Sequence, residues 1–115
     1  MTQTLHFGRD DQGYNAYAPM DASVKYRVTL AANTAQSVTL PSEKGRYIVA
    51  FSVQGGARVW VDFTAAATLP TGAMASTTAS LNPAQRMLMG GTTISLITAD
   101  TNADVGIEVW STGML

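Results

Sequence analysis

The sequence has no cysteine, a single histidine and few charged residues. Without cysteine there are no disulfides, thiolate metal sites or cysteine nucleophiles, so the fold must be held by packing. Charged residues make up 13% of the chain, which is about half of the usual share in globular proteins. The 7 Lys and Arg residues nearly balance the 8 Asp and Glu residues, and no segment concentrates one sign. The sequence therefore lacks the basic surface expected of a nucleic-acid-binding protein.

Long apolar runs are also absent. No run approaches the roughly 20 apolar residues that cross a bilayer, and the N-terminal stretch MTQTLHFGRDD lacks the apolar core of a secretory signal. We expect no membrane partner and synthesis in the cytoplasm. The low share of charged residues permits two interpretations. The chain is either a domain kept soluble by Thr, Ser, Asn and Gln or a subunit docked in an assembly.

Catalytic and metal-binding motifs are missing as well. The one histidine, His6, lies in the N-terminal segment, away from any preformed cleft, and no GxSxG, phosphate-binding glycine loop or HExxH occurs. Residues 100–106 begin like a calcium loop, but the glycine comes one residue late and Ser111 stands where a bidentate glutamate is needed. A turn rich in Asp and Asn is the favoured interpretation. We expect no enzymatic activity, no cofactor and no metal.

What the chain does contain is two-residue alternation of apolar and polar residues, which is typical of half-buried strands. Residues 46–53 and 57–63 are expected to pair as one long hairpin through the loop 54–56, with their apolar side chains on a shared face. Residues 100–103 are expected to form the last hairpin loop. Residues 64–80 are broken by proline and glycine and are expected to form a long loop, with one short strand within it as an alternative. The predicted strands span residues 24–30, 36–40, 46–53, 57–63, 85–89, 92–99 and 105–110.

Short strands at regular spacing, without a credible amphipathic helix, predict an all-β fold. We expect a single-domain antiparallel β-sandwich, jelly-roll-like, over residues 21–115. Residues 1–20 show scattered aromatic residues and no period, so they are expected to form an extended N-terminal arm. A frayed tail is the alternative for this segment.

The two tryptophans each share a strand face with charged residues. In the stretch SVQGGARVWVDF, Trp60 alternates with valines and lies on the side of Arg58 and Asp62, and Trp110 lies on the side of Glu108. Large aromatic side chains often dominate binding, so one interpretation is that a partner covers both rings. The other is that the N-terminal arm or the 64–80 loop buries them. The candidate partner-binding residues are Tyr14, Tyr17, Arg58, Trp60, Asp62, Glu108 and Trp110.

Three stretches carry a resemblance to a known class of proteins: VTLAANTAQSVTLPSEKGRYIVAFSV, VWVDF and LNPAQRMLMGGTTISLITADTNADVGIEVW, within residues 24–110. In style, the chain resembles small structural proteins of tailed bacteriophage virions, in particular capsid decoration or cement proteins. The resemblance implies a jelly-roll-like sandwich on the capsid surface that forms homo-oligomers, often trimers, and clamps the joints between subunits of the major capsid protein. It assigns no role to a residue by position.

A carbohydrate- or receptor-binding module of a phage tail fibre or spike is the alternative function. Exposed tryptophans on a β-sandwich suit stacking against sugar rings, and neighbouring Asp and Arg side chains could supply hydrogen bonds to hydroxyl groups.

Overall fold

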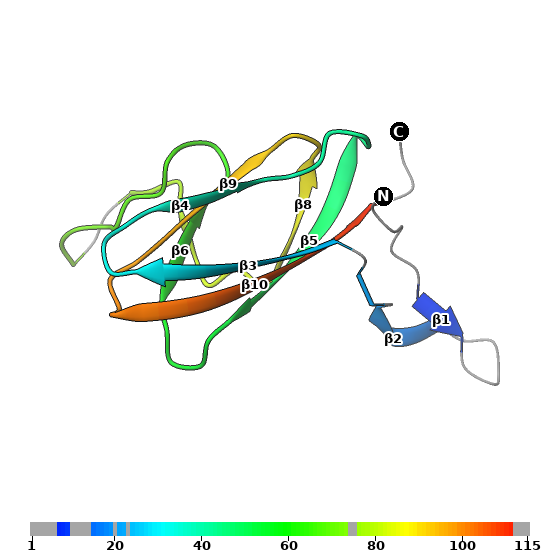
Figure 1. The fold of residues 1–115 in the computed structure, drawn as a ribbon, viewed down its shortest axis with the longest axis horizontal. Helices are drawn as coiled ribbons and strands as arrows, with labels where there is room; N and C mark the ends of the chain where they lie inside the picture. The colour runs from blue at the N-terminus through cyan, green and yellow to red at the C-terminus, as the bar shows by residue number, and fades with distance from the viewer. Residues whose placement is uncertain (1–6, 10–14, 20, 23, 74–75, 112–115) are drawn as a thin grey trace.

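The structure is a computed structural model that describes residues 7–9, 15–19, 21–22, 24–73 and 76–111. Within these residues the chain forms strands and no helix (Figure 1). The strands are β1 (Phe7–Arg9), β2 (Asn15–Pro19), β3 (Val24–Ala31), β4 (Gln36–Thr39), β5 (Arg46–Val53), β6 (Val59–Asp62), β7 (Ser80–Leu81), β8 (Gln85–Met89), β9 (Thr93–Thr98) and β10 (Asn102–Ser111). The predicted all-β fold is confirmed, with most predicted strands within a few residues of their observed bounds.

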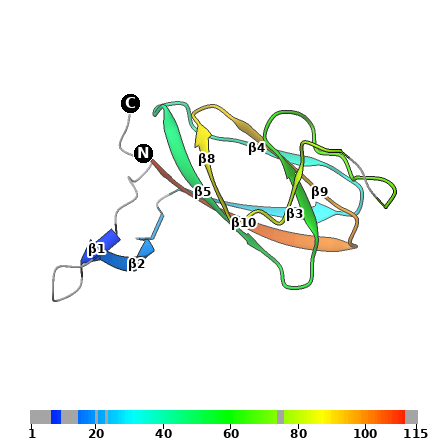
Figure 2. The ribbon, with the colours of Figure 1, turned by 180° about the vertical axis from the view of Figure 1, so that it is seen from behind.

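Eight of the strands build two four-stranded antiparallel sheets. The first sheet has the order β3-β10-β5-β8 and the second has the order β4-β9-β6-β7. Strands β1 and β2 form a separate antiparallel pair, which lies outside both sheets in Figures 1 and 2. This arrangement fits a β-sandwich.

The predicted hairpin of residues 46–53 and 57–63 is wrong. Strand β5 pairs with β10 and β8, whereas β6 pairs with β9 and β7. The turn after β5, closed by a hydrogen bond from Ala57 N to Gln54 O (3.1 Å), carries the chain into the other sheet. Residues 99–101 likewise join β9 to β10 across the sandwich, so they are not a hairpin loop within one sheet. Alternation identifies an apolar face, but it does not say whether two such faces lie side by side or opposite each other.

The core fills the space between the inner faces of the two sheets. Its phenylalanines are in contact, with the ring centroids of Phe51 and Phe63 6.0 Å apart, and the buried Tyr47 hydroxyl accepts a hydrogen bond from Lys44 N (3.0 Å). Each buried side chain of this size contributes about 1.5–3 kcal/mol, and a one-residue slip would turn a whole strand's apolar set outward. The fully buried members include Leu30, Tyr47, Val49, Val59, Val61, Ile94, Leu96, Val105, Ile107 and Val109.

Residues 82–84 tie the two sheets together between β7 and β8. Asn82, which has a left-handed backbone (φ 44°), exchanges hydrogen bonds with β6: its N donates to Val59 O (2.8 Å) and its Oδ1 accepts from Val59 N (2.7 Å). Two residues later, Ala84 O accepts from Phe51 N of β5 (2.9 Å). The edge strands β7 and β8 are therefore held on the same side of the sandwich.

The turn after β8 is fixed by close backbone contact with residues 41–45. Gly90 N donates to Gly45 O (2.9 Å), and a Cβ at Gly90 would overlap the Lys44 carbonyl oxygen. We predict that Gly90→Ala lowers the free energy of unfolding by about 2–3 kcal/mol, because the backbone must shift to admit the methyl group.

Gly55→Ala is the matched control, since a Cβ at Gly55 meets open space and its effect should stay within about 0.5 kcal/mol. Urea unfolding of the two variants measures the difference. Equal unfolding midpoints would show that the turn at Gly90 is not packed as described.

Candidate functional site

The predicted contact residues do not form one surface. Arg58 directly precedes β6, in the second sheet. Trp60 and Asp62 lie on the outer face of β6, because the alternating Val59 and Val61 are buried in the core. Glu108 and Trp110 lie on the outer face of β10, in the first sheet, because Ile107 and Val109 point into the core. The two outer faces point away from each other, so the two tryptophans lie on opposite sides of the sandwich.

The two predicted tyrosines belong to the N-terminal segment. Tyr14 lies outside the described residues. Tyr17 lies in β2, of which the backbone is described. Their role as contact residues stays a prediction.

Trp110 is buried by its own chain. Its residue exposure is 2%, and its directly opposite neighbour on β5 is the partly buried Ile48. The expectation that both rings are offered to a partner is therefore wrong for Trp110. Sequence alternation placed Trp110 on the outer face correctly, but it could not show that this end of the face is covered.

Asp62 is an internal anchor for the long loop that follows β6. The residue is 3% exposed, and its Oδ1 accepts hydrogen bonds from Thr64 N (2.8 Å), Thr64 Oγ1 (3.0 Å) and Ala65 N (3.0 Å). Its Oδ2 accepts one from Thr78 Oγ1, at the far end of the loop. The bond from Thr78, followed by those from Thr64 and Ala65, lowers the pKa of Asp62 to about 2. Asp62 is thus committed to the fold, and its prediction as a contact residue is wrong.

We predict that Asp62→Asn lowers the free energy of unfolding at pH 7 by about 2 kcal/mol, the usual contribution of hydrogen bonds to a charged group. The folded-state pKa of about 2 lies below the ordinary value of 3.8, so the ionised carboxylate stabilises the fold fully at higher pH. This contribution is lost as the pH falls from about 4 to about 2. Urea unfolding at several pH values should show wild type and variant converging over that window.

The control for Asp62 is Asp21→Asn. It removes the exposed ion pair of Asp21 with Lys25 (2.7 Å), which should change stability by less than about 1 kcal/mol. A difference for Asp62→Asn that stays constant down to pH 2 would contradict the anchoring role.

Trp60 forms part of a shallow hollow beside the loop. The ring is half-buried, and Ile97 on β9 and Leu81 on β7 lie directly opposite on either side. The Arg58 guanidinium makes no hydrogen bond or ion pair with another described residue, while its backbone N donates to Asp100 Oδ2 (2.8 Å). The hollow has a volume of about 490 Å³, and its lining includes Arg58, Trp60, Leu69, Pro70, Leu81 and Asp100.

The different burial of the two tryptophans can be measured. In Trp110→Phe the remaining indole is Trp60, and in Trp60→Phe it is Trp110. We predict that acrylamide quenches the fluorescence of Trp110→Phe more strongly, because the half-buried ring meets the quencher and the buried ring does not. Circular dichroism of both variants controls for folding, and equal quenching would contradict the assigned burial.

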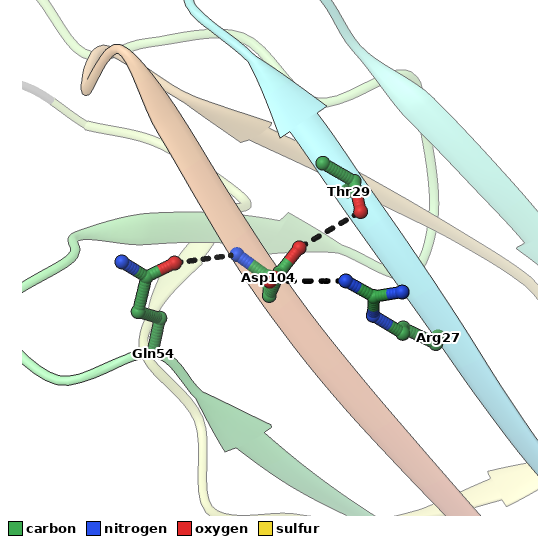
Figure 3. Close-up of polar contacts among 4 residues, drawn as sticks. All are labelled: Arg27, Thr29, Gln54 and Asp104. Atoms are coloured by element: carbon green, nitrogen blue, oxygen red, sulfur yellow. Dashed lines mark hydrogen bonds and ion pairs between the residues drawn. The ribbon is translucent and has the colours of Figure 1, made fainter.

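The outer face of the first sheet carries a polar cluster around Asp104 (Figure 3). Asp104 Oδ1 accepts a hydrogen bond from Thr29 Oγ1 (2.8 Å), Oδ2 accepts one from Arg27 (3.2 Å), and Asp104 N donates to Gln54 Oε1 (3.1 Å). The Thr29 and Arg27 bonds hold the pKa of Asp104 below its usual value. The cluster therefore fastens β3 and the β5–β6 turn to β10.

Glu108 continues the same face, directly opposite Lys25. Asp104, Gly106 and Glu108 are among the residues that line an open hollow of about 640 Å³ on this face. The residues of the calcium-like stretch serve separate parts of the fold, since Asp100 binds the Arg58 backbone and Asp104 binds β3. Within the described ranges, no three His, Cys, Asp or Glu side chains come together as a metal site would require.

Exposed apolar side chains that the sequence analysis did not predict as contact residues lie on β7 and β8. Of the residues that the structure describes, the exposed large hydrophobic side chains are Leu81 (47%), Met87 (60%) and Met89 (69%). Leu81 lies opposite Trp60 on the outer face of the second sheet, whereas Met87 and Met89 lie on the outer face of the first sheet, so only the two methionines share a surface. The signal was present in QRMLM, where three consecutive apolar residues place apolar side chains on both faces of one short strand.

No protein-family model, curated protein or solved structure matches this chain. In the part of the chain that the structure covers, no helix is long and apolar enough to span a membrane.

Proposed function

We propose that this protein is a non-enzymatic virion structural protein that binds and stabilises an assembled bacteriophage capsid, as a decoration or cement protein on the capsid surface. The observation that carries the proposal is the exposed pair Met87 and Met89 on the edge strand β8. Exposed apolar side chains on an open sheet edge mark a surface that another protein covers. In a weakly charged protein, such a surface is expected of a subunit that is bound in an assembly.

The order of the strands supports the same proposal. Consecutive strands alternate between the two sheets, except that β6 and β7 are neighbours in the second sheet. We infer that the eight strands form a jelly roll, the arrangement of two Greek keys that occurs in viral capsid domains and in lectins.

The carboxylates support a role without chemistry. Asp62, Asp100 and Asp104 each accept hydrogen bonds from the chain's own groups. Bonds of this kind hold the pKa of Asp62 and of Asp104 low, and a general acid needs a raised pKa. These side chains therefore serve the fold better than catalysis.

The remaining parts of the proposal concern assembly. Residues 1–20 would act as an arm that adds main-chain hydrogen bonds to a neighbouring molecule, with Tyr14 and Tyr17 as contact residues. The protein would form a homo-oligomer, with a trimer as the expected form, and its partner on the virion would be the major capsid protein. Stabilisation follows from mass action, because the protein binds the assembled shell and not the separate subunits. At a free protein concentration of 100 times Kd, binding stabilises the shell by about 2.7 kcal/mol per site.

We predict that the purified protein sediments with capsids that lack it and raises their melting temperature. The double variant Met87→Glu, Met89→Glu should lose both effects, because two carboxylates would be desolvated in the interface. Differential scanning calorimetry and sedimentation of shells mixed with protein measure the two effects.

Ala31→Glu is the matched control. Ala31 is exposed at the end of β3, the opposite edge of the same sheet, so the variant adds a carboxylate away from Met87 and Met89. Its binding should equal that of the wild type. Wild-type protein that neither sediments with shells nor raises their melting temperature would refute the proposed function.

The Trp60 hollow favours a second candidate function, carbohydrate binding within a tail fibre or spike. A half-buried indole offers a flat apolar surface to a sugar ring, and Arg58 and Asp100 at the rim could hydrogen bond to hydroxyl groups. Glycan-dependent quenching of Trp60 fluorescence in Trp110→Phe, without binding to shells, would favour this function over capsid stabilisation.

A further inference from the structure

Strand β8 leaves one side of the first sheet open. Among the described strands it pairs with β5 and with no other. Its residues Gln85, Arg86, Met87 and Met89 are exposed, and Leu88 is half-buried. An open edge of this kind presents main-chain donors and acceptors to solvent.

The flanking hydrogen bonds show which main-chain groups face outward. Phe51 N donates to Ala84 O and Gly90 N donates to Gly45 O, both at 2.9 Å, on either side of the ladder between β5 and β8. In an antiparallel ladder every second residue bonds to a given neighbour. Residues 86 and 88 therefore bond to β5, and the N–H and C=O groups of Gln85, Met87 and Met89 point toward the open edge.

The chain itself occupies the carbonyl groups at both ends of this edge. Gln85 O accepts a hydrogen bond from Arg86 Nη1 (2.7 Å). Met89 O accepts hydrogen bonds from Thr92 Oγ1 (2.7 Å) and Thr92 N (3.2 Å). Met87, in the centre, is left with both its N–H and its C=O directed outward. A partner strand would therefore find one complete donor and acceptor pair, at Met87.

The side chains at the edge define what a partner strand would carry. Met87 and Met89 lie on the outer face and offer flexible apolar contacts, a property of methionine at adaptable binding surfaces. Arg86 lies on the other face, and its bond to Gln85 O places the guanidinium beside the edge. The charged residues of β5 and β8 are Arg46 and Arg86, both exposed, and neither strand contains an acidic residue. The strand β8 is thus apolar on its outer face, at Met87 and Met89, and positively charged on its other face, at Arg86.

We propose that β8 binds an extended strand of a partner protein by β-sheet addition, centred on Met87, and that this strand carries apolar residues beside Met87 and Met89 and an acidic residue beside Arg86. That the partner strand belongs to the capsid shell rests on the proposed function, whereas strand addition at β8 does not. Main-chain bonds would supply affinity, and the alternating side chains would supply selectivity.

A second copy of β8 fits this edge less well. Antiparallel pairing of two such strands about Met87 would place the two Arg86 side chains near each other across the two-fold axis, and like charges in neighbouring cross-strand positions are destabilising. Charge complementarity favours an acidic strand.

The test uses the full chain and two ten-residue peptides, one alternating valine with glutamate and the other alternating valine with lysine. Amide hydrogen exchange measured by NMR reports on Met87 directly. We predict that the glutamate peptide slows exchange of the Met87 amide by about tenfold at 90% occupancy, since only the free edge exchanges. The lysine peptide should leave the exchange unchanged.

Three variants separate edge pairing from general effects on folding. Met87→Pro removes the outward N–H, which edge strands tolerate, and should weaken binding of the glutamate peptide about five- to tenfold, equivalent to one hydrogen bond. Met87→Leu keeps the N–H and should bind normally. Arg86→Pro removes an N–H that bonds to β5, so it should lower the melting temperature more than Met87→Pro does.

Charge reversal provides an independent measurement that does not need a proline. Arg86→Glu should reverse the preference, so that the lysine peptide protects Met87 and the glutamate peptide does not. Equal protection by both peptides would refute the acidic partner. No protection by either peptide at millimolar concentration would refute strand addition.

Other outcomes identify other occupants. Protection of Met87 that rises with protein concentration in the absence of peptide would assign the edge to a second copy and overturn the proposal. Peptide binding combined with failure to bind shells would refute the proposed function alone. Shell binding that survives Met87→Pro and Arg86→Glu would refute β8 as the docking edge and leave the proposed function standing.

Discussion

The packing of two four-stranded sheets on one apolar core is the constraint on which the rest of the molecule depends. Because β5 and β6 belong to different sheets, their apolar side chains meet across the core, and the outer sides of β6 and β10 point in opposite directions. This separates Trp60 from Trp110. The same arrangement brings β7 and β8 to one side, where residues 82–84 bind both sheets. The same constraint separates Leu81, beside Trp60, from Met87 and Met89, which lie on the side of Trp110.

The polar residues of the fold mainly fasten segments that the core does not hold. Asp62 gathers both ends of the loop after β6, and Ser95 Oγ accepts a hydrogen bond from Ala67 N (2.9 Å) within it. Asp104 fastens β3 and the β5–β6 turn. With few charged residues in the chain, the carboxylates of Asp62, Asp100 and Asp104 each hold a segment of the fold. The surface left for recognition is therefore mostly uncharged, with main-chain groups and methionines as its distinctive elements.

The sequence predicted the strands well and their pairing poorly. Alternation at Val24–Leu30 and at residues 46–53 directly reflects one buried face, so strand existence and face could be predicted. Pairing depends on which faces meet after the chain has crossed the core, and the short turn at residues 54–56 fits a hairpin as well as a crossing. Trp110 illustrates the same limit. Its face was predictable, but its burial depends on neighbours distant in the sequence.

The open edge of β8 combines features that oppose indiscriminate pairing with features that permit selective pairing. Natural edge strands are often protected by a charged side chain, and Arg86 has that role here because its guanidinium occupies Gln85 O. Met87 and Met89, in contrast, leave apolar surface in water at a cost in free energy. An arginine repels a basic strand and attracts an acidic one. Protection by Arg86 and the proposed recognition through Met87 are therefore compatible, since the charge that repels basic strands attracts acidic ones.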